Sequence, residues 1–160
     1  MHNKLLFLSL ISFLVSCATS PDFDTTQVDQ SLTPQSVIAE PAISRNKIAL
    51  WGGTILDTRN LKDTTQIEVL SYPLDSFHKP MQGSKPLGRF IIQHQGYLEP
   101  TAYAQGRRLT VLGNVSDSKL GKVGESNYTY PVINSRQLHL WSPDSGESKT
   151  SFHLGIGVRL

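Results

Sequence analysis

Cys17 has the clearest chemical role in the sequence, and it is the only cysteine in the chain. It follows Leu14-Val15-Ser16 at the end of the apolar run Leu5–Val15, which begins just after Lys4. The run is shorter than the roughly 20 apolar residues of a transmembrane helix, and its layout is typical of a secretory signal. Two aliphatic residues, a small residue and a cysteine form a lipobox. We therefore predict cleavage between Ser16 and Cys17, and lipidation of Cys17.

This modification would also determine the location of the protein. A lipobox cysteine receives a diacylglyceryl group and usually a further acyl chain such as palmitate, which together are enough for stable membrane anchoring. Lipoproteins kept in the inner membrane commonly carry Asp directly after the cysteine, whereas this chain has Ala18. We therefore expect the membrane to be a partner through an N-terminal lipid, at the outer membrane, with the domain facing the periplasm. An ordinary signal peptide with a chance cysteine, or an uncleaved short anchor, is the alternative.

Histidines could bind a metal ion, but their spacing does not favour it. Four of them fall in four separate predicted elements: His78, His94, His139 and His153. None shows a ligand spacing such as His-x-x-x-His. The segment 121–124 likewise lacks the glycine-lysine spacing of a phosphate loop. We predict no metal and no cofactor, and interpret the histidines as surface or strand residues.

Carboxylates and hydroxyls could support hydrolysis. The candidate carboxylates for glycoside cleavage are Glu68, Glu99 and Glu125. The candidate nucleophiles, which lack the context of a nucleophile elbow, are Ser71, Ser84 and Ser126. The sequence does not show how far apart the carboxylates lie, and solvated strand and loop charges are the simpler interpretation. No catalytic residue is predicted.

Arginines and tyrosines leave two interpretations open. Arg107-Arg108 flanks a predicted strand, where it could contact an anionic ligand or pair with Glu99. Four tyrosines could stack on a glycan, as in some small barrels, or pack across strands: Tyr97, Tyr103, Tyr128 and Tyr130. Packing is the commoner role for such side chains.

The charge balance does not favour a nucleic-acid partner. The chain has 160 residues with 15 Lys and Arg and 13 Asp and Glu, and Lys4 is the one charged residue in the predicted signal. The remaining 144 residues therefore carry 14 basic and 13 acidic side chains, whereas a nucleic-acid-binding protein shows a clustered basic face. With Cys17 acylated, no thiol is left for a disulfide, so the exported domain must be stable on packing alone.

The chain divides into three parts. Residues 1–16 are the predicted lipoprotein signal peptide, and residues 17–40 are rich in Ser, Thr, Pro, Gln and Asp. We interpret 17–40 as a flexible lipidated tether, with a brief strand at Ser36–Ala39, and 41–160 as a β-domain. About 120 residues are enough to bury a core.

Short alternating segments separated by Gly, Pro and Asn predict strands in the β-domain. The expected strands are Ile48–Leu56, Thr65–Tyr72, Gly88–His94, Arg107–Val115, Tyr128–Ile133, Gln137–Trp141 and Ser151–Leu160. Gly52-Gly53 predicts a bulge or sharp bend in the strand Ile48–Leu56. Asn134-Ser135 predicts a hairpin turn, and Gly121 and Gly124 predict a loop. The long 73–87 loop is expected to be functional or mobile. The predicted fold is all-β: a small antiparallel β-barrel (OB-like) or a sandwich of about six or seven short strands.

Several short motifs occur in a recognisable order. They are the lipobox, Trp51-Gly52-Gly53, Glu68–Leu74, Gly88-Arg89-Phe90, Gly96–Pro100, Tyr103, Gly106-Arg107, Thr110–Gly113, Tyr128–Val132 and Trp141. Together they resemble the Slp family, outer-membrane lipoproteins of Gram-negative bacteria whose founder is induced by starvation. One departure is Arg45-Asn46, where the family tends to have an aromatic-x-Gly step. Because Asn tolerates the left-handed backbone, we expect the turn to survive.

The resemblance implies a location and a fold but no chemistry. We therefore expect a non-catalytic structural or binding protein of the cell envelope, active in stress or stationary-phase adaptation, with an unknown envelope protein or glycan as partner. The alternative is an envelope hydrolase that acts on glycans with Glu and Tyr residues of the β-domain. Converging carboxylates in a cleft would favour the alternative.

Overall fold

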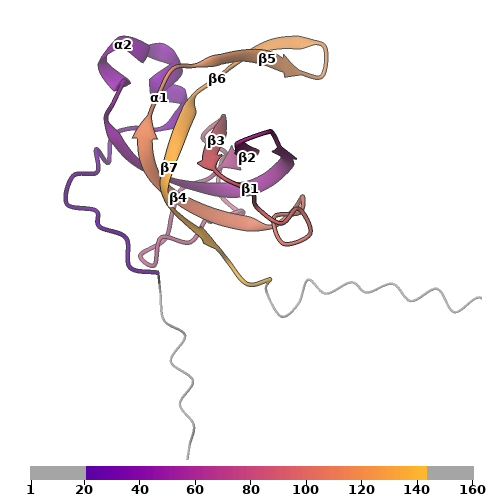
Figure 1. Cartoon of the computed structure of the whole chain (residues 1–160). Coiled ribbons are helices and arrows are strands. Elements are labelled where there is room, and N and C mark those ends of the chain that lie inside the picture. The colour runs from indigo at the N-terminus through magenta and orange to yellow at the C-terminus, as the bar shows by residue number, and fades with distance from the viewer. Residues whose placement is uncertain (1–20, 144–160) are drawn as a thin grey trace, which may run out of the picture.

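The computed structural model describes residues 21–143, which form a closed five-stranded barrel, one further hairpin and two short helices (Figure 1). The elements are α1 (Pro34–Ala39), α2 (Pro41–Ser44), β1 (Ile48–Asn60), β2 (Thr64–Ser71), β3 (Arg89–Gln95), β4 (Arg108–Val115), β5 (Lys119–Val123), β6 (Ser126–Tyr130) and β7 (Val132–Leu140). Around the barrel the strand order is β1-β2-β3-β7-β4. This is the OB-like alternative of the predicted fold class, and not the sandwich.

The sequence led us to expect a wholly antiparallel barrel, and this expectation is wrong for one pair of strands. Strand β7 pairs antiparallel with β4 but parallel with β3, where Ile92 lies opposite Ile133. The other three pairings of the ring, β1–β2, β1–β4 and β2–β3, are antiparallel. A connection long enough for the β5–β6 hairpin separates β4 from β7, which lets β7 enter the ring beside β3.

The paired glycines lie where β1 changes partner, and the irregularity that we predicted at them lies farther along the strand. Gly53 pairs with Ser71 of β2 and also with Leu109 of β4, and the β1–β2 register shifts just beyond it, between Ile55 and Asp57. A Cβ atom on Gly53 would overlap the carbonyl oxygen of Leu70. Because only glycine permits such close backbone approach, one strand can belong to both sides of the ring.

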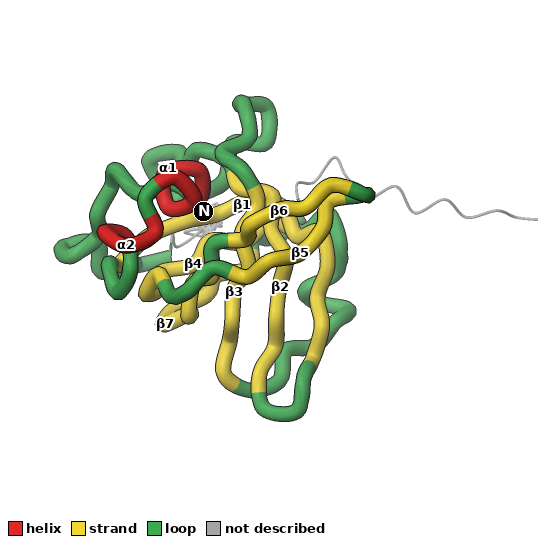
Figure 2. Tube along the Cα trace, turned by 90° about the horizontal axis from the view of Figure 1, so that it is seen from above, coloured by secondary structure: helices red, strands yellow, loops and turns green. Residues whose placement is uncertain are grey.

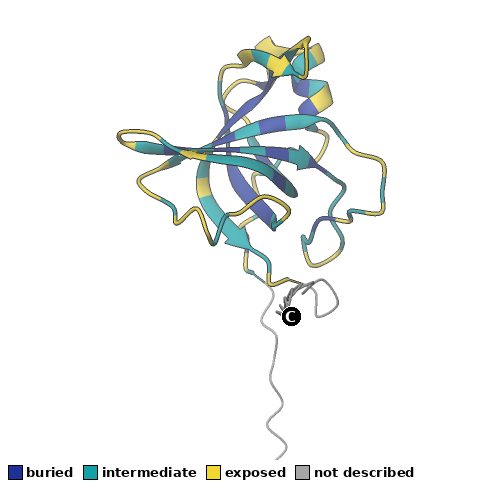
Figure 3. Cartoon of the chain, turned by 90° about the vertical axis from the view of Figure 1, so that its right-hand side faces the viewer, coloured by how far each residue is buried: buried dark blue, intermediate teal, exposed yellow. Residues whose placement is uncertain are grey.

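The core fills the barrel interior, as the dark blue segments of Figure 3 show. Alternation along β2 places four side chains inside: Thr65, Ile67, Val69 and Ser71. Phe90 of β3 is fully buried and packs edge-on against Trp51, with ring centroids 5.1 Å apart. Burial of such side chains is the main favourable contribution to folding.

Residues 21–40, predicted to form part of a flexible tether, instead pack on the barrel. Phe23, Leu32 and Val37 are buried, and Trp51 Nε1 donates a hydrogen bond of 2.8 Å to the Leu32 carbonyl. The predicted strand at Ser36–Ala39 is wrong, since these residues lie in α1. Thr33 caps this helix through a capping box and Pro34 opens it, and these are local signals that outweigh the polar composition.

The region after β4 also differs from the prediction. Asn134-Ser135 lies within β7 and not in a turn, while the segment around Gly121 forms strand β5 and not a loop. The turn of the actual hairpin is Gly124-Glu125, with Gly124 at φ +60°. A positive φ at the first turn position suits glycine in a tight hairpin. Pro131 separates β6 from β7 because it cannot donate a ladder hydrogen bond.

Two other predictions have different outcomes. Asn46 adopts φ +65°, so the turn before β1 is left-handed, as expected from Asn. The predicted last strand, Ser151–Leu160, lies outside the described residues, as do Ser16 and Cys17. The ring formed by residues 21–143 is closed by β7, which pairs with both β3 and β4.

Candidate functional site

The site with the most charged side chains is a cleft of about 260 Å³ between the β5–β6 hairpin and the outer face of the barrel. We call it the hairpin cleft. Figure 2 shows the hairpin passing over β2 and β3. The residues that line the cleft are Asp57, Arg59, Gln66, Glu68, Ile91, Lys119, Leu120, Gly121, Lys122 and Tyr130. They come from five strands, so the folded barrel is needed to assemble the site.

Glu68 is the best-connected side chain of the hairpin cleft. It projects from β2, and Arg89 Nη1 on β3 donates a hydrogen bond of 2.8 Å to its Oε1. The Tyr130 hydroxyl lies 3.2 Å from the same oxygen and 3.0 Å from the Lys122 carbonyl. Burial, and then the negative charge of Glu68, raise the pKa of the Tyr130 phenol above its ordinary value. The phenol therefore stays protonated and able to donate.

A second carboxylate, Asp57, lies directly opposite Glu68 in the β1–β2 register. Its Oδ2 accepts a hydrogen bond of 2.6 Å from Arg59 Nε. Like charges on facing residues of an antiparallel pair repel each other, and here each carboxylate has a guanidinium as counter-ion. Sequence reasoning missed Asp57 because it ended the first strand at Leu56. Its role depends on the pairing of β1 with β2, which the sequence does not display.

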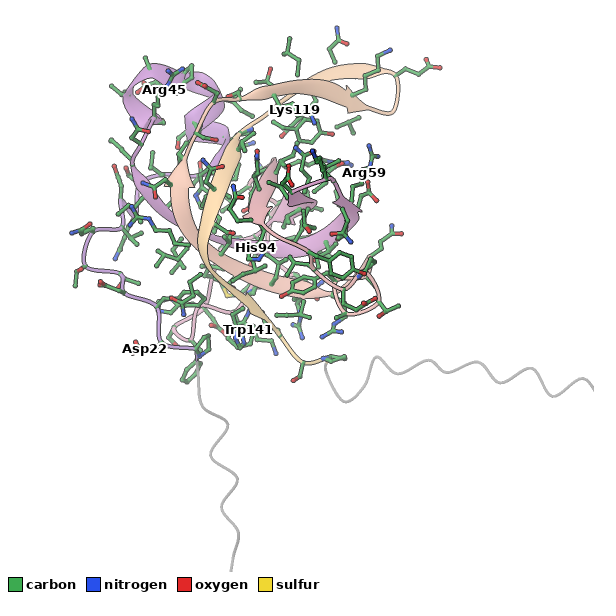
Figure 4. The ribbon with its side chains drawn as sticks, in the orientation of Figure 1. Asp22, Arg45, Arg59, His94, Lys119 and Trp141 are labelled. Carbon is green, nitrogen blue, oxygen red and sulfur yellow. The ribbon has the colours of Figure 1, made fainter. Side chains whose placement is uncertain are left out.

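The hairpin side of the cleft is basic. Lys119 Nζ donates a hydrogen bond of 3.2 Å to Gln66 Oε1 across the cleft, and Lys122, three residues farther along β5, also lines it. Figure 4 labels Lys119 on the hairpin and Arg59 on β1. The cleft therefore presents both charge signs and neutral amide and phenol groups, which suits a ligand with many donors and acceptors better than a simple anion or cation.

The tyrosines predicted from sequence divide into two groups. Tyr128 and Tyr130 come together in β6 with ring centroids 4.8 Å apart, and the Tyr128 hydroxyl accepts a hydrogen bond from the Arg89 N–H. Tyr97 is exposed in the loop after β3, and Tyr103 packs against the core. The first pair therefore borders the hairpin cleft, while the other two lie elsewhere.

The other candidates do not gather at the cleft. Glu99 accepts hydrogen bonds from the Thr101 side chain and backbone, and Glu125 lies in the hairpin turn. Arg107 donates to the backbone carbonyls of Ala102 and Trp141, 3.2 and 2.9 Å away, so it joins two chain segments. This position indicates a structural role for Arg107 and not contact with an anion.

The serines and histidines are likewise dispersed. Ser71 is buried at the end of β2, Ser84 lies in the 73–87 loop, and Ser126 begins β6. His78 lies in a loop, and His94 and His139 lie in strands β3 and β7. His153 is outside the described residues. Burial lowers the pKa of His139 below its ordinary value. Within residues 21–143 no three His, Cys, Asp or Glu side chains are grouped as metal ligands.

A larger cavity, of about 350 Å³, lies at the seam between the N-terminal segment and the barrel. Leu32 and Thr33 line it on one side, and Trp51, Tyr72 and His78 on the other. We call it the seam cavity. The Asp and Glu, Lys and Arg side chains in its lining are Asp29 and Asp75 alone, so it offers a ligand fewer charged groups than the hairpin cleft.

Sequence comparison identifies a family. A model described as the outer membrane lipoprotein Slp family matches residues 14–156. An uncharacterized protein of Haemophilus influenzae is 36% identical over 97 residues, which is 60% of this chain and 52% of that protein. In Escherichia coli K12, outer membrane protein Slp is 27% identical over 88% of this chain and 76% of its own length. The uncharacterized lipoprotein YeaY is 29% identical, covering 80% and 66% respectively.

The chain thus spans about half the length of the first of these relatives. Among solved structures, a small single-stranded DNA-binding protein from Streptomyces coelicolor aligns with 60% of this chain and 94% of its own, at 11% identity and a TM-score of 0.38. Schizosaccharomyces pombe Pot1pC bound to single-stranded DNA aligns with 67% of this chain and 86% of its own, at 15% identity and a TM-score of 0.33.

None of the helices in residues 21–143 is both long and apolar enough to span a bilayer.

Proposed function

This chain belongs to the outer membrane lipoprotein Slp family, and from this premise we propose that it is a non-catalytic binding protein of the outer membrane. Lipid on Cys17 anchors it after residues 1–16 are removed, and the barrel faces the periplasm. The hairpin cleft binds a glycan of the envelope. A role in stress or stationary-phase adaptation is supported by the resemblance to the founder of the family.

The observation that carries the glycan proposal is the hydrogen-bonding arrangement around Glu68. Its carboxylate is held by Arg89 and lies beside the Tyr130 hydroxyl, so it is pre-oriented in a half-buried position. Gln66 and the two lysines of β5 add an amide and further donors at the same cleft. Sugars present closely spaced hydroxyls that both donate and accept, and a cleft with both kinds of partner matches them.

A titration of the full chain in detergent with oligosaccharides of N-acetylglucosamine tests this proposal. Binding should shift backbone amide resonances of β2 and β5 in NMR spectra. Glu68→Gln should weaken binding about tenfold or more, because a hydrogen bond to a charged group contributes roughly 1.5–3 kcal/mol. Glu99→Gln, on a different loop, is the matched control and should bind normally. Shifts confined to other surfaces, or equal affinities for both variants, would disprove a site at this cleft.

A hydrolase acting on the same glycans is the second candidate, and one observation favours it. Asp57 and Glu68 lie opposite each other in the same cleft, and two carboxylates flank the scissile bond in most glycosidases. Against it, each carboxylate already forms an ion pair with an arginine, an arrangement suited to holding charge. Release of new reducing ends from the oligosaccharide, lost in Glu68→Gln, would establish the hydrolase. Binding without release supports the binding protein.

A further inference from the structure

Two large apolar side chains are exposed on the loop between β2 and β3. Phe77 is 61% exposed and Met81 is 40% exposed. They lie four positions apart in the 73–87 loop, at the end of the barrel away from the β5–β6 hairpin (Figure 1). Exposed apolar groups that gather on one surface are typical of interaction sites with proteins or membranes.

Hydrogen bonds hold the 73–87 loop in one conformation, and this conformation exposes Phe77. Asp75 Oδ1 accepts hydrogen bonds from the N–H groups of Phe77 and Lys79, at 2.8 and 2.9 Å. The Met81 N–H donates to the Pro73 carbonyl at 2.9 Å, which closes the loop at its base. Thr110 Oγ1 of β4 donates to the carbonyl of His78, the neighbour of Phe77, at 2.7 Å. These bonds fix the loop to the barrel and leave Phe77 pointing outward.

The N-terminal segment reaches the barrel at this same loop. Phe23 is only 5% exposed and packs edge-on against His78, with ring centroids 5.9 Å apart. The Asp22 carbonyl accepts a hydrogen bond of 2.8 Å from Gln137 Nε2 of β7. Cys17 precedes Phe23 by six positions in the sequence, and an extended chain spans at most about 3.3–3.6 Å per residue. Cys17 therefore lies within roughly 20 Å of Phe23, whatever path the chain takes.

We propose that the 73–87 loop is a second membrane contact, in which Phe77 and Met81 enter the boundary between headgroups and acyl chains. The proposal rests on the lipidation of Cys17 proposed above, because the lipid holds this end of the barrel at the bilayer surface. An anchored domain needs only weak further contact, since tethering raises its effective concentration at the membrane. Apolar side chains of this kind bind at the headgroup–acyl boundary.

The charges around the loop indicate that the contact is apolar. Three carboxylates and two ammonium groups belong to this region: Asp22, Asp24, Asp75, Lys79 and Lys85. Their opposing signs give no net attraction to anionic lipid. The contact should therefore change little with salt, unlike binding through a polybasic patch.

Tryptophan fluorescence in vesicles tests this contact. The lipidated full chain is reconstituted in vesicles of phosphatidylethanolamine and phosphatidylglycerol, with and without acyl-chain bromination, which quenches nearby indoles. Phe77→Trp carries the probe, and Leu120→Trp, on the hairpin at an 81% exposed position, is the matched control. The parent chain corrects for Trp51 and Trp141. We expect the indole at position 77 to shift to the blue and to lose most of its emission in brominated vesicles, while the indole at 120 keeps its emission.

The outcomes separate this inference from the proposed anchor. If the protein floats with the vesicles but the indole at position 77 is not quenched, the anchor stands and the loop contact is wrong. If the chain carries no lipid, its free Cys17 thiol is coupled to a maleimide lipid, which restores the same tether for the same measurement. Quenching at 77 and not at 120 then still supports the contact. Equal quenching at both positions, or loss of quenching in high salt, would overturn it.

Discussion

Gly53 shows how a single residue constrains the barrel. A Cβ atom added to this residue would overlap the backbone carbonyl of Leu70, which cannot move aside because it belongs to the paired strand. We predict that Gly53→Ala destabilises the fold by about 1–3 kcal/mol or more, as overpacking does. Chemical denaturation measures this change. Gly83→Ala, where a Cβ meets nothing within 4 Å, is the control and should leave the free energy of unfolding almost unchanged.

Asp29 is expected to make stability depend on pH. Hydrogen bonds from Lys47, first, and then from Ser31 lower the pKa of its carboxyl to about 2 from an ordinary 3.8. Because the folded pKa is lowered, the contribution of Asp29 is complete above about pH 4 and is lost as the pH falls toward 2. NMR titration of the carboxyl should give a midpoint near 2. In Lys47→Met the midpoint should move up toward 3.8, and an unchanged midpoint would show that the ion pair does not form in solution.

Site residues could be predicted from the sequence only where their local pattern was sufficient. Glu68 and Tyr130 were singled out as candidates, and Asn46 was expected in a left-handed turn, which its φ of +65° confirms. Asp57 was missed because its role depends on the β1–β2 register, which brings it opposite Glu68. Cross-strand neighbours are set by pairing, and no spacing along one chain reveals them.

Elements with strict alternation were predicted well, and those with competing signals were not. Strands β2 and β3 carry a buried face of period two, which is visible in the sequence. Strand β5 has no buried side chain, so its sequence resembled a loop, whereas most of β6 fell within the predicted strand Tyr128–Ile133. Parallel pairing of β3 with β7 leaves the same alternation as antiparallel pairing would, so its direction could not be derived from the sequence.

Helix α1 is expected to hold the N-terminal segment on the barrel. Thr33 accepts a hydrogen bond from the Ser36 N–H, and Val37 on the same helix is buried. Replacing an N-cap Thr with Ala costs about 1 kcal/mol, so Thr33→Ala should raise amide exchange across residues 21–40 while the barrel strands stay protected. Thr26→Ala, at an exposed site, is the control. Unaltered exchange at α1 in Thr33→Ala would mean that packing alone holds the segment.

The molecule as a whole has two functional ends in this account. The start of the described chain, at residues 21–23, and the 73–87 loop lie at one end of the barrel, and the β5–β6 hairpin lies at the other (Figure 1). If the first end is at the membrane, the hairpin cleft faces away from the lipid, where a glycan can reach it. The docking of residues 21–40 shortens the tether and so limits how far the barrel can rise from the bilayer.

Sorting to the outer membrane should depend on Ala18. Asp directly after the lipidated cysteine commonly retains lipoproteins in the inner membrane, so Ala18→Asp should move the protein to inner-membrane fractions. Sucrose-gradient fractionation of the native host measures this shift, with Ala18→Ser as a control that should stay with outer-membrane markers. An Ala18→Asp protein still found in the outer membrane would show that another feature governs sorting.

Lipidation of Cys17 is the claim on which the proposed anchoring of the protein at the membrane depends. Metabolic labelling with a radioactive fatty acid tests it most directly, comparing the wild-type chain with Cys17→Ser in the same host. We predict that the wild-type protein carries label, begins at residue 17 and sediments with membranes, and that Cys17→Ser carries no label and is released from them. A Cys17→Ser protein that still carries label and still sediments with membranes would contradict the anchor.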